Sequence, residues 1–216
     1  MERLTAELQI VETTMRLSKA AGRLDAVSRP DGDIEESMRS IGIDPLAAGK
    51  AAEGRATVLF AALSNKKPVT EIGFVKIASH THLILMSAAW TEGLLLGLLM
   101  ESGSLPQQAG FLQIAEASRK LDSLSEEHGP AETSLTFGLQ IEYLFRFCKA
   151  RSEILLQAAR MEAAELKIDQ AQSQDPWLDK AAAGALMDGL LVGCCLRSID
   201  HKVGEGPSGD IPASEL

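Results

Sequence analysis

Two acidic residues, Glu92 and Asp188, lie in otherwise apolar stretches and are the first candidates for chemistry. A carboxylate buried in an apolar helix must be ion-paired, hydrogen-bonded or protonated. One interpretation is that the two acids meet, sharing a proton or holding a cation. The other, which we favour, is that each forms an ion pair with an arginine such as Arg55 or Arg151, one pair in each half of the chain.

Other groups that could bind metal have unsuitable spacing. His80 and His82 are two residues apart, so a helix places them on different sides. Glu162 and Glu165 lack the histidine that helix-bundle metal sites place beside such acids, and a solvated helix face explains them better. We predict no metal and no cofactor.

The net charge and the cysteine content limit the class of partner and the cellular compartment. The chain is acidic, with a formal net charge of −9, and has no basic stripe, which argues against a nucleic-acid partner. Its three cysteines, Cys148, Cys194 and Cys195, have no metal-type spacing, and neighbouring cysteines pair with each other poorly. We expect buried thiols in a reducing cytoplasm.

The two acids belong to a pattern that occurs twice, at positions 96 apart (185 minus 89). The copies are Ala89-x-x-Glu92-Gly93-Leu94-Leu95-Leu96-Gly97 and Ala185-x-x-Asp188-Gly189-Leu190-Leu191-Val192-Gly193. The same offset aligns 41–43 with 137–139 and 55–62 with 151–158, whereas 63–88 aligns poorly. We therefore predict an internal duplication, with halves at about 40–103 and 136–199, related by a pseudo-twofold axis.

The glycines of the pattern predict close helix packing. Ala89, Gly93 and Gly97 are four residues apart and share one side of a helix, as do Ala185, Gly189 and Gly193. An interior glycine costs a helix about 1 kcal/mol relative to alanine, and close approach of another helix is a common compensation. We expect the two helices to cross at these glycines.

The surrounding elements are predicted to be helical throughout, because alanine and leucine dominate and strand-like alternation is nearly absent. We predict an all-α bundle of about six to seven helices. The N-terminal helix occupies 3–28 within a unit of 1–32, the duplicated bundle occupies 33–203, and 204–216 is a flexible tail. The expected helices within the bundle are at about 33–42, 45–64, 70–102, 106–128, 133–172 and 176–202.

Residues 83–100 have only the minimum length of a membrane span and contain Glu92, so we expect a buried helix instead.

With no catalytic motif found, we predict a non-enzymatic protein-protein interaction or assembly module, which is oligomeric. Its partner would be another protein or a second copy. The alternatives are an all-α enzyme, or a small-ligand sensor, with a central site around Glu92 and Asp188.

Overall fold

The computed structural model describes residues 2–27, 34–64, 72–100, 109–165 and 176–204. Within these residues the chain forms seven helices and no strand, which confirms the all-α bundle. The helices are α1 (Glu2–Val27), α2 (Ile34–Ser40), α3 (Pro45–Ser64), α4 (Ile72–Leu99), α5 (Phe111–Thr136), α6 (Ile141–Glu165) and α7 (Pro176–Gly204). One isolated backbone bridge joins Ile43 to Ala109.

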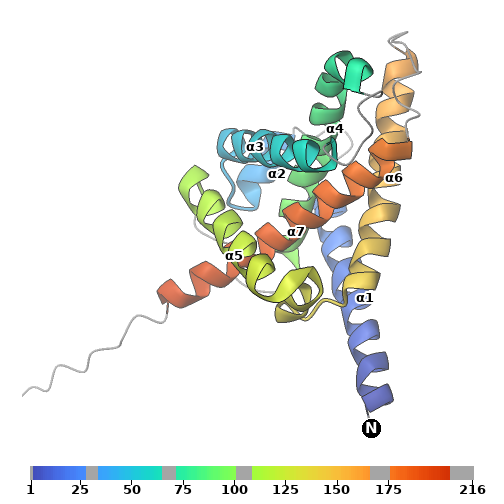
Figure 1. Cartoon of the computed structure of the whole chain (residues 1–216). Helices are drawn as coiled ribbons and strands as arrows, with labels where there is room; N and C mark the ends of the chain where they lie inside the picture. Colours follow the sequence, from blue (N-terminus) through green and yellow to red (C-terminus); the bar gives the residue numbers. More distant parts are fainter. Residues whose placement is uncertain (1, 28–33, 65–71, 101–108, 166–175, 205–216) are drawn as a thin grey trace, which may run out of the picture.

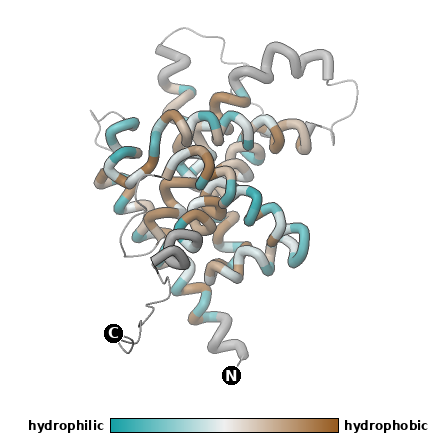
Figure 2. The backbone as a smooth tube through the Cα atoms, turned by 90° about the vertical axis from the view of Figure 1, so that its left-hand side faces the viewer, coloured by the Kyte–Doolittle hydropathy of each residue, from teal (hydrophilic) through white to brown (hydrophobic). Residues whose placement is uncertain are grey.

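Helices α4 and α7 cross in the middle of the molecule, and the other helices pack around them (Figure 1). Both helices bury side chains on several sides, including Trp90, Leu94, Leu186 and Leu190, each 0% exposed. Apolar segments gather in the interior of the backbone path, and polar segments lie on its outer turns (Figure 2). The core is therefore built on the two helices that carry the repeated pattern.

Helix α3 begins where the sequence predicted it. The Asp44 side chain accepts a hydrogen bond from the Leu46 amide at 3.1 Å, and Pro45 occupies the first helical position. An acidic cap followed by proline suits a helix start, because the first amides have no partner within the helix. The expected limits at 45 and 64 agree with α3.

The expected helix over 133–172 is wrong. Helix α5 continues to Thr136, and α6 starts only at Ile141. Gly138 lies between them with φ of 67°, in the left-handed region that ends helices. The expected end of the preceding helix near 128 agrees with a break inside α5: Gly129 is non-helical, with φ of 77° and ψ of 165°, and a second helical stretch continues from Pro130 to Thr136.

The α2–α3 and α5–α6 turns have the same hydrogen bonds. The Gly42 amide donates to Arg39 O at 3.0 Å and the Ile43 amide to Met38 O at 2.9 Å. Ninety-six residues later, the Gly138 amide donates to Leu135 O at 2.8 Å and the Leu139 amide to Ser134 O at 3.0 Å. Both glycines have positive φ, which explains the glycine at each position.

The expected start of a helix near residue 70 lies outside the described residues, as do its end near 102 and the last part of the predicted 133–172 helix. The predicted flexible tail lies there too, except for Gly204 at the end of α7.

Candidate functional site

The four glycines of the repeated pattern lie at the α4–α7 crossing. A β carbon on Gly193 would be 2.9 Å from the Gly97 Cα, and one on Gly93 would be 2.8 Å from the Leu190 amide nitrogen. Ala89 and Ala185, on the same sides of the helices, are 1% and 0% exposed. The backbones therefore touch, and no larger residue fits at these glycines without moving a helix.

One arginine centre forms around Asp188. The Arg55 guanidinium donates to both Asp188 oxygens, from Nε at 3.0 Å and from Nη2 at 2.6 Å. Its Nη1 atom donates to both oxygens of Asp122, at 2.9 and 2.8 Å. Asp188 also accepts the indole N–H of Trp90 at 2.7 Å. Asp188 is thus fully paired, with its side chain 15% exposed.

A second centre forms around Glu92. Arg151 donates from Nε to Glu92 Oε1 and from Nη2 to Asp25 Oδ1, the latter at 2.5 Å. The Glu92 side chain is 11% exposed, whereas that of Asp25 is 56% exposed. Each arginine therefore connects one buried acid of a crossing helix to one exposed acid of an outer helix.

The pairing exchanges partners between the two parts of the chain. We had expected one pair within each half, but Arg55 binds Asp188 and Arg151 binds Glu92. Because α4 and α7 cross closely, Asp188 of α7 faces α3, which packs on α4. Glu92 of α4 likewise faces α6, which packs on α7. Each acid is held by its own arginine, so the alternative in which the two acids share a proton or a cation does not describe this arrangement.

Burial and hydrogen bonding act in opposite directions at these centres. Burial raises the pKa of Glu92 above its ordinary value, and the hydrogen bond from Arg151 opposes that rise. Burial alone would lower the pKa of Arg151, but its bonds to Asp25 and Glu92 outweigh burial and raise it. The pKa of Arg55 is raised in the same way, through Asp188 and Asp122. Both arginines stay charged, so neither can act as an acid or a base near neutral pH.

The thiols are no better suited to chemistry. Cys148, Cys194 and Cys195 are buried and form no disulfide. Burial raises the pKa of Cys195 to about 11, and it raises that of Cys148 further. A thiol is nucleophilic only as the thiolate, so these two are inert. In the part of the chain that the structure describes, no group of three or more His, Cys, Asp or Glu residues could hold a metal ion.

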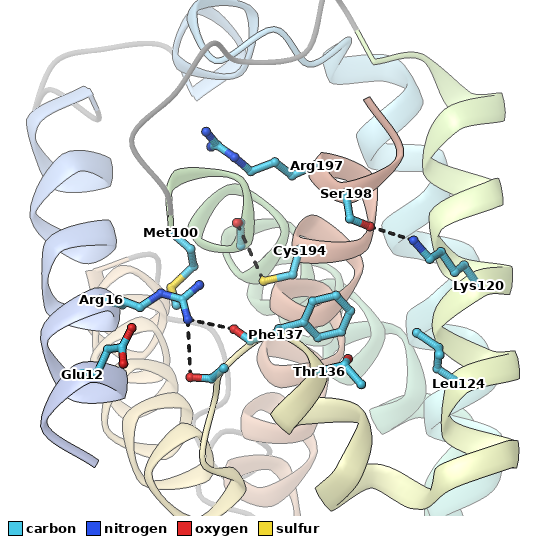
Figure 3. Close-up of a pocket in the computed structure, with 12 residues that line it drawn as sticks. Glu12, Arg16, Met100, Lys120, Leu124, Thr136, Phe137, Cys194, Arg197 and Ser198 are labelled. Carbon is cyan, nitrogen blue, oxygen red and sulfur yellow. Dashed lines mark hydrogen bonds between the residues drawn. The ribbon is translucent and has the colours of Figure 1, made fainter. Parts of the chain in front are cut away.

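A pocket of about 800 Å³ opens away from these centres, between α1, α5 and the ends of α4 and α7 (Figure 3). Positive side chains from three helices line it: Arg16, Lys120 and Arg197. Among the described residues of the pocket wall, Glu12 is the one acid, so that part of the lining is net positive. A smaller pocket of about 300 Å³ adjoins Asp188 and Asp122 and is lined mainly by apolar side chains.

Several residues of these sites were missed from the sequence. Asp25 and Asp122 resemble any exposed acid on an amphipathic helix, and only the arginines opposite them give them a role. Trp90 lies in the core, and nothing in the sequence around it signals its hydrogen bond to Asp188. The pocket cations come from separate helices, so no spacing rule could have grouped them.

Comparison with protein-family models, with curated proteins and with solved structures finds no match.

Proposed function

We propose that this protein is a non-enzymatic interaction module that self-associates through helix α1. The observation that carries the proposal is a line of large apolar side chains on the solvent side of α1. Leu8, Val11 and Met15 are 64%, 62% and 48% exposed. Exposed apolar side chains that form a continuous line, rather than lying singly, are typical of interaction sites.

The line lies opposite the face that α1 packs into the protein. Thr13, Leu17, Ala20 and Leu24 are buried, at helical spacing. At about 100° per residue, Leu8, Val11 and Met15 lie about half a turn away from them. Their spacing of three and four continues back to Leu4 in the sequence, which is the heptad spacing of a coiled-coil seam. Helix α1 packs mainly against α4 and α6, and neither covers this side.

The charges beside the seam favour an antiparallel pair with a second copy. In a parallel pair, Glu7 of one copy would face Glu12 of the other, twice, and like charges at these positions repel. In an antiparallel pair centred between Leu8 and Val11, Leu8 faces Val11 of the second copy. Glu7 then faces the neutral Thr14 of the second copy instead of an acid. The apolar layers are retained without the repulsion.

The proposal includes an internal duplication. The matched turns at Gly42 and Gly138 and the two arginine centres support it. In this proposal α1 is the counterpart of α5, because Asp25 and Asp122 occupy the same place at the two centres. The buried residues Leu17, Ala20 and Leu24 then match Ile114, Ala117 and Leu121. The N-terminal helix would be part of the first copy rather than an addition.

A cytoplasmic location without membrane insertion completes the proposal. Two helical segments, His82–Leu99 and Trp177–Ser198, have the length and hydropathy of a membrane span. However, 61% of the first segment and 78% of the second are buried inside the structure. Core helices of a soluble bundle have the same properties. The three thiols, which form no disulfide, suit a reducing compartment.

Light scattering coupled to size exclusion tests self-association. We expect a concentration-dependent shift from monomer to dimer for the parent protein. Leu8→Glu should keep the protein monomeric, because it places a charge in the seam at an exposed position that the fold does not need. The matched control is Leu112→Glu, at a 76% exposed leucine of α5, which should dimerise like the parent. A parent that stays monomeric at millimolar concentration, or equal effects of the two substitutions, would refute the proposal.

A further inference from the structure

The pocket between α1, α5 and α7 differs in charge from the chain as a whole. The chain has a formal net charge of −9, yet the described residues that line this pocket include three cations and one acid. The cations come from three different helices around the pocket. Figure 3 shows Arg16 and Lys120 on opposite sides of it and the Arg197 guanidinium apart from both. A positive, partly enclosed surface concentrates anions, because the low-dielectric walls strengthen the field of the charges.

Two of the cations also have a structural role. Arg16 Nη1 donates to Phe137 O at 2.8 Å and to Gly138 O at 3.4 Å, at the end of α5. Arg197, only 4% exposed, donates from Nη1 to Leu98 O near the end of α4. Cations at the carboxyl ends of helices stabilise the last carbonyl groups. A helix-end role alone therefore accounts for these two residues.

Lys120 is different. Its ammonium group donates to Ser198 Oγ at 2.7 Å, and that hydroxyl donates to Cys195 O at 2.7 Å. In the described part of the chain, no carboxylate forms an ion pair with Lys120. Its charge is thus held at the pocket wall by a neutral group and keeps donors available for an anion.

Beside the charged residues, Thr136, Ser198 and two glycines, the described wall is apolar. Met100, Leu124, Phe137 and Cys194 line it between the cations. A volume of about 800 Å³ is within the range of small-molecule sites, which combine apolar walls with a few placed polar groups. A fully polar anion such as inorganic phosphate would leave these apolar walls without contacts.

We infer that this pocket binds a small organic carboxylate with an apolar body, whose carboxylate contacts Lys120 and whose body lies along Leu124 and Phe137. The proposed carboxylate contact, Lys120, lies on α5 and outside the α1 seam, although Glu12 of α1 both lines the pocket and flanks that seam. The pocket also differs from a ligand site around Glu92 and Asp188, where the acids are already paired and would repel an anion.

Isothermal titration calorimetry with decanoate tests the inference. We expect one decanoate site per chain. Its affinity should be at least tenfold stronger than that of acetate, which supplies only the carboxylate, or of decanol, which supplies the apolar chain without the carboxylate. Lys120→Met should weaken decanoate binding at least tenfold, and Lys120→Arg should retain most of it. Lys50→Met, at an exposed lysine of α3, is the matched control and should bind like the parent.

Alkylation of Cys194 gives a second readout. Cys194 lines the pocket, whereas Cys148 and Cys195 are 0% exposed. Bound decanoate should slow alkylation of Cys194 at least several-fold in the parent protein but not in Lys120→Met. Absence of decanoate binding at millimolar concentration would overturn the inference, and so would equal binding by Lys120→Met and Lys50→Met.

Discussion

The indole nitrogen of Trp90 donates a hydrogen bond to Oδ2 of Asp188, 2.7 Å away, across the α4–α7 crossing. The residue 96 positions after Trp90 is Leu186, which has no side-chain donor. The two arginine centres therefore differ in one respect. Asp188 is held by an arginine and an indole, whereas Glu92 accepts side-chain hydrogen bonds from Arg151 alone among the described contacts.

Removing Arg151 should destabilise the fold more than removing Arg55. Breaking a buried ion pair from one side costs about 3–5 kcal/mol when the other charge is left uncompensated. Arg151→Met leaves the buried Glu92 carboxylate without a compensating charge. Arg55→Met also removes a cation, but Asp188 keeps its hydrogen bond from Trp90. We expect the free energy of unfolding to fall by at least about 1 kcal/mol more for Arg151→Met, since a hydrogen bond to a charged group contributes about that much. Urea unfolding measures the difference, and equal losses would contradict it.

The effect of Trp90→Phe should depend on which arginine is present. In the parent, Trp90→Phe removes one of two hydrogen-bond donors to Asp188, because Arg55 remains. In Arg55→Met, the same substitution removes the remaining donor among the described contacts. The cavity left by the smaller ring is common to both backgrounds and cancels in a double-mutant cycle. We expect Trp90→Phe to cost about 1 kcal/mol more in Arg55→Met than in Arg151→Met. Additive costs in both backgrounds would show that the indole bond does not support Asp188.

Alanine should be poorly tolerated at the glycines of the helix crossing and well tolerated at an open helical position such as Gly54. At Gly97 the new β carbon would lie 2.9 Å from the Gly193 Cα and 3.0 Å from the Cys194 amide nitrogen. Separating the backbones should cost about 3 kcal/mol or more, at the upper end for overpacked cores. Gly54→Ala is the control, because its β carbon meets nothing within 4 Å, and it should stabilise α3 by about 0.5–1 kcal/mol. Thermal unfolding of both variants checks the prediction, and similar melting temperatures would refute it.

The free energy of unfolding of the parent should fall, relative to that of Glu92→Gln, as the pH rises. Because burial raises the pKa of Glu92 in the folded state, the folded protein holds this proton more tightly than the unfolded chain. The resulting stabilisation is present below the ordinary pKa of a glutamate and is lost as the pH rises through the folded value. Comparing urea unfolding of the parent and Glu92→Gln at several pH values isolates this group. A parent that gains stability relative to Glu92→Gln as pH rises would mean that Arg151 lowers the pKa of Glu92.

Cys148 and Cys195 should react slowly in the folded protein. With a pKa of about 11, roughly a thousandth of Cys195 is thiolate at pH 8, and the side chain is also 0% exposed. We expect iodoacetamide to modify Cys148 and Cys195 within minutes only after denaturation with urea. Mass spectrometry of timed samples identifies the modified residue. Rapid modification of either thiol without denaturant would show that α6 or α7 opens readily.

Local signals were enough to predict most of the helices but not the way their polar groups meet. The Asp44-Pro45 pair predicted the start of α3, and periodicity predicted the full length of α1. Gly138 was overlooked because the apolar residues on both sides continue with nearly helical spacing, although the repeat aligns it with Gly42, where a helix was expected to end. The partners of Glu92 and Asp188 could be narrowed to Arg55 and Arg151, but their assignment depends on how α4 crosses α7, which spacing along one chain does not determine.

The exchanged pairs also bear on synthesis of the chain at the ribosome. Glu92 is made 59 residues before Arg151, and Asp188 appears 133 residues after Arg55. Early in translation, α4 therefore carries an acid in an apolar helix before its cation exists, and its glycine side has no α7 to pack against. The nascent chain cannot complete a stable N-terminal unit first, so we expect it to fold as a single cooperative unit after nearly the whole chain has emerged.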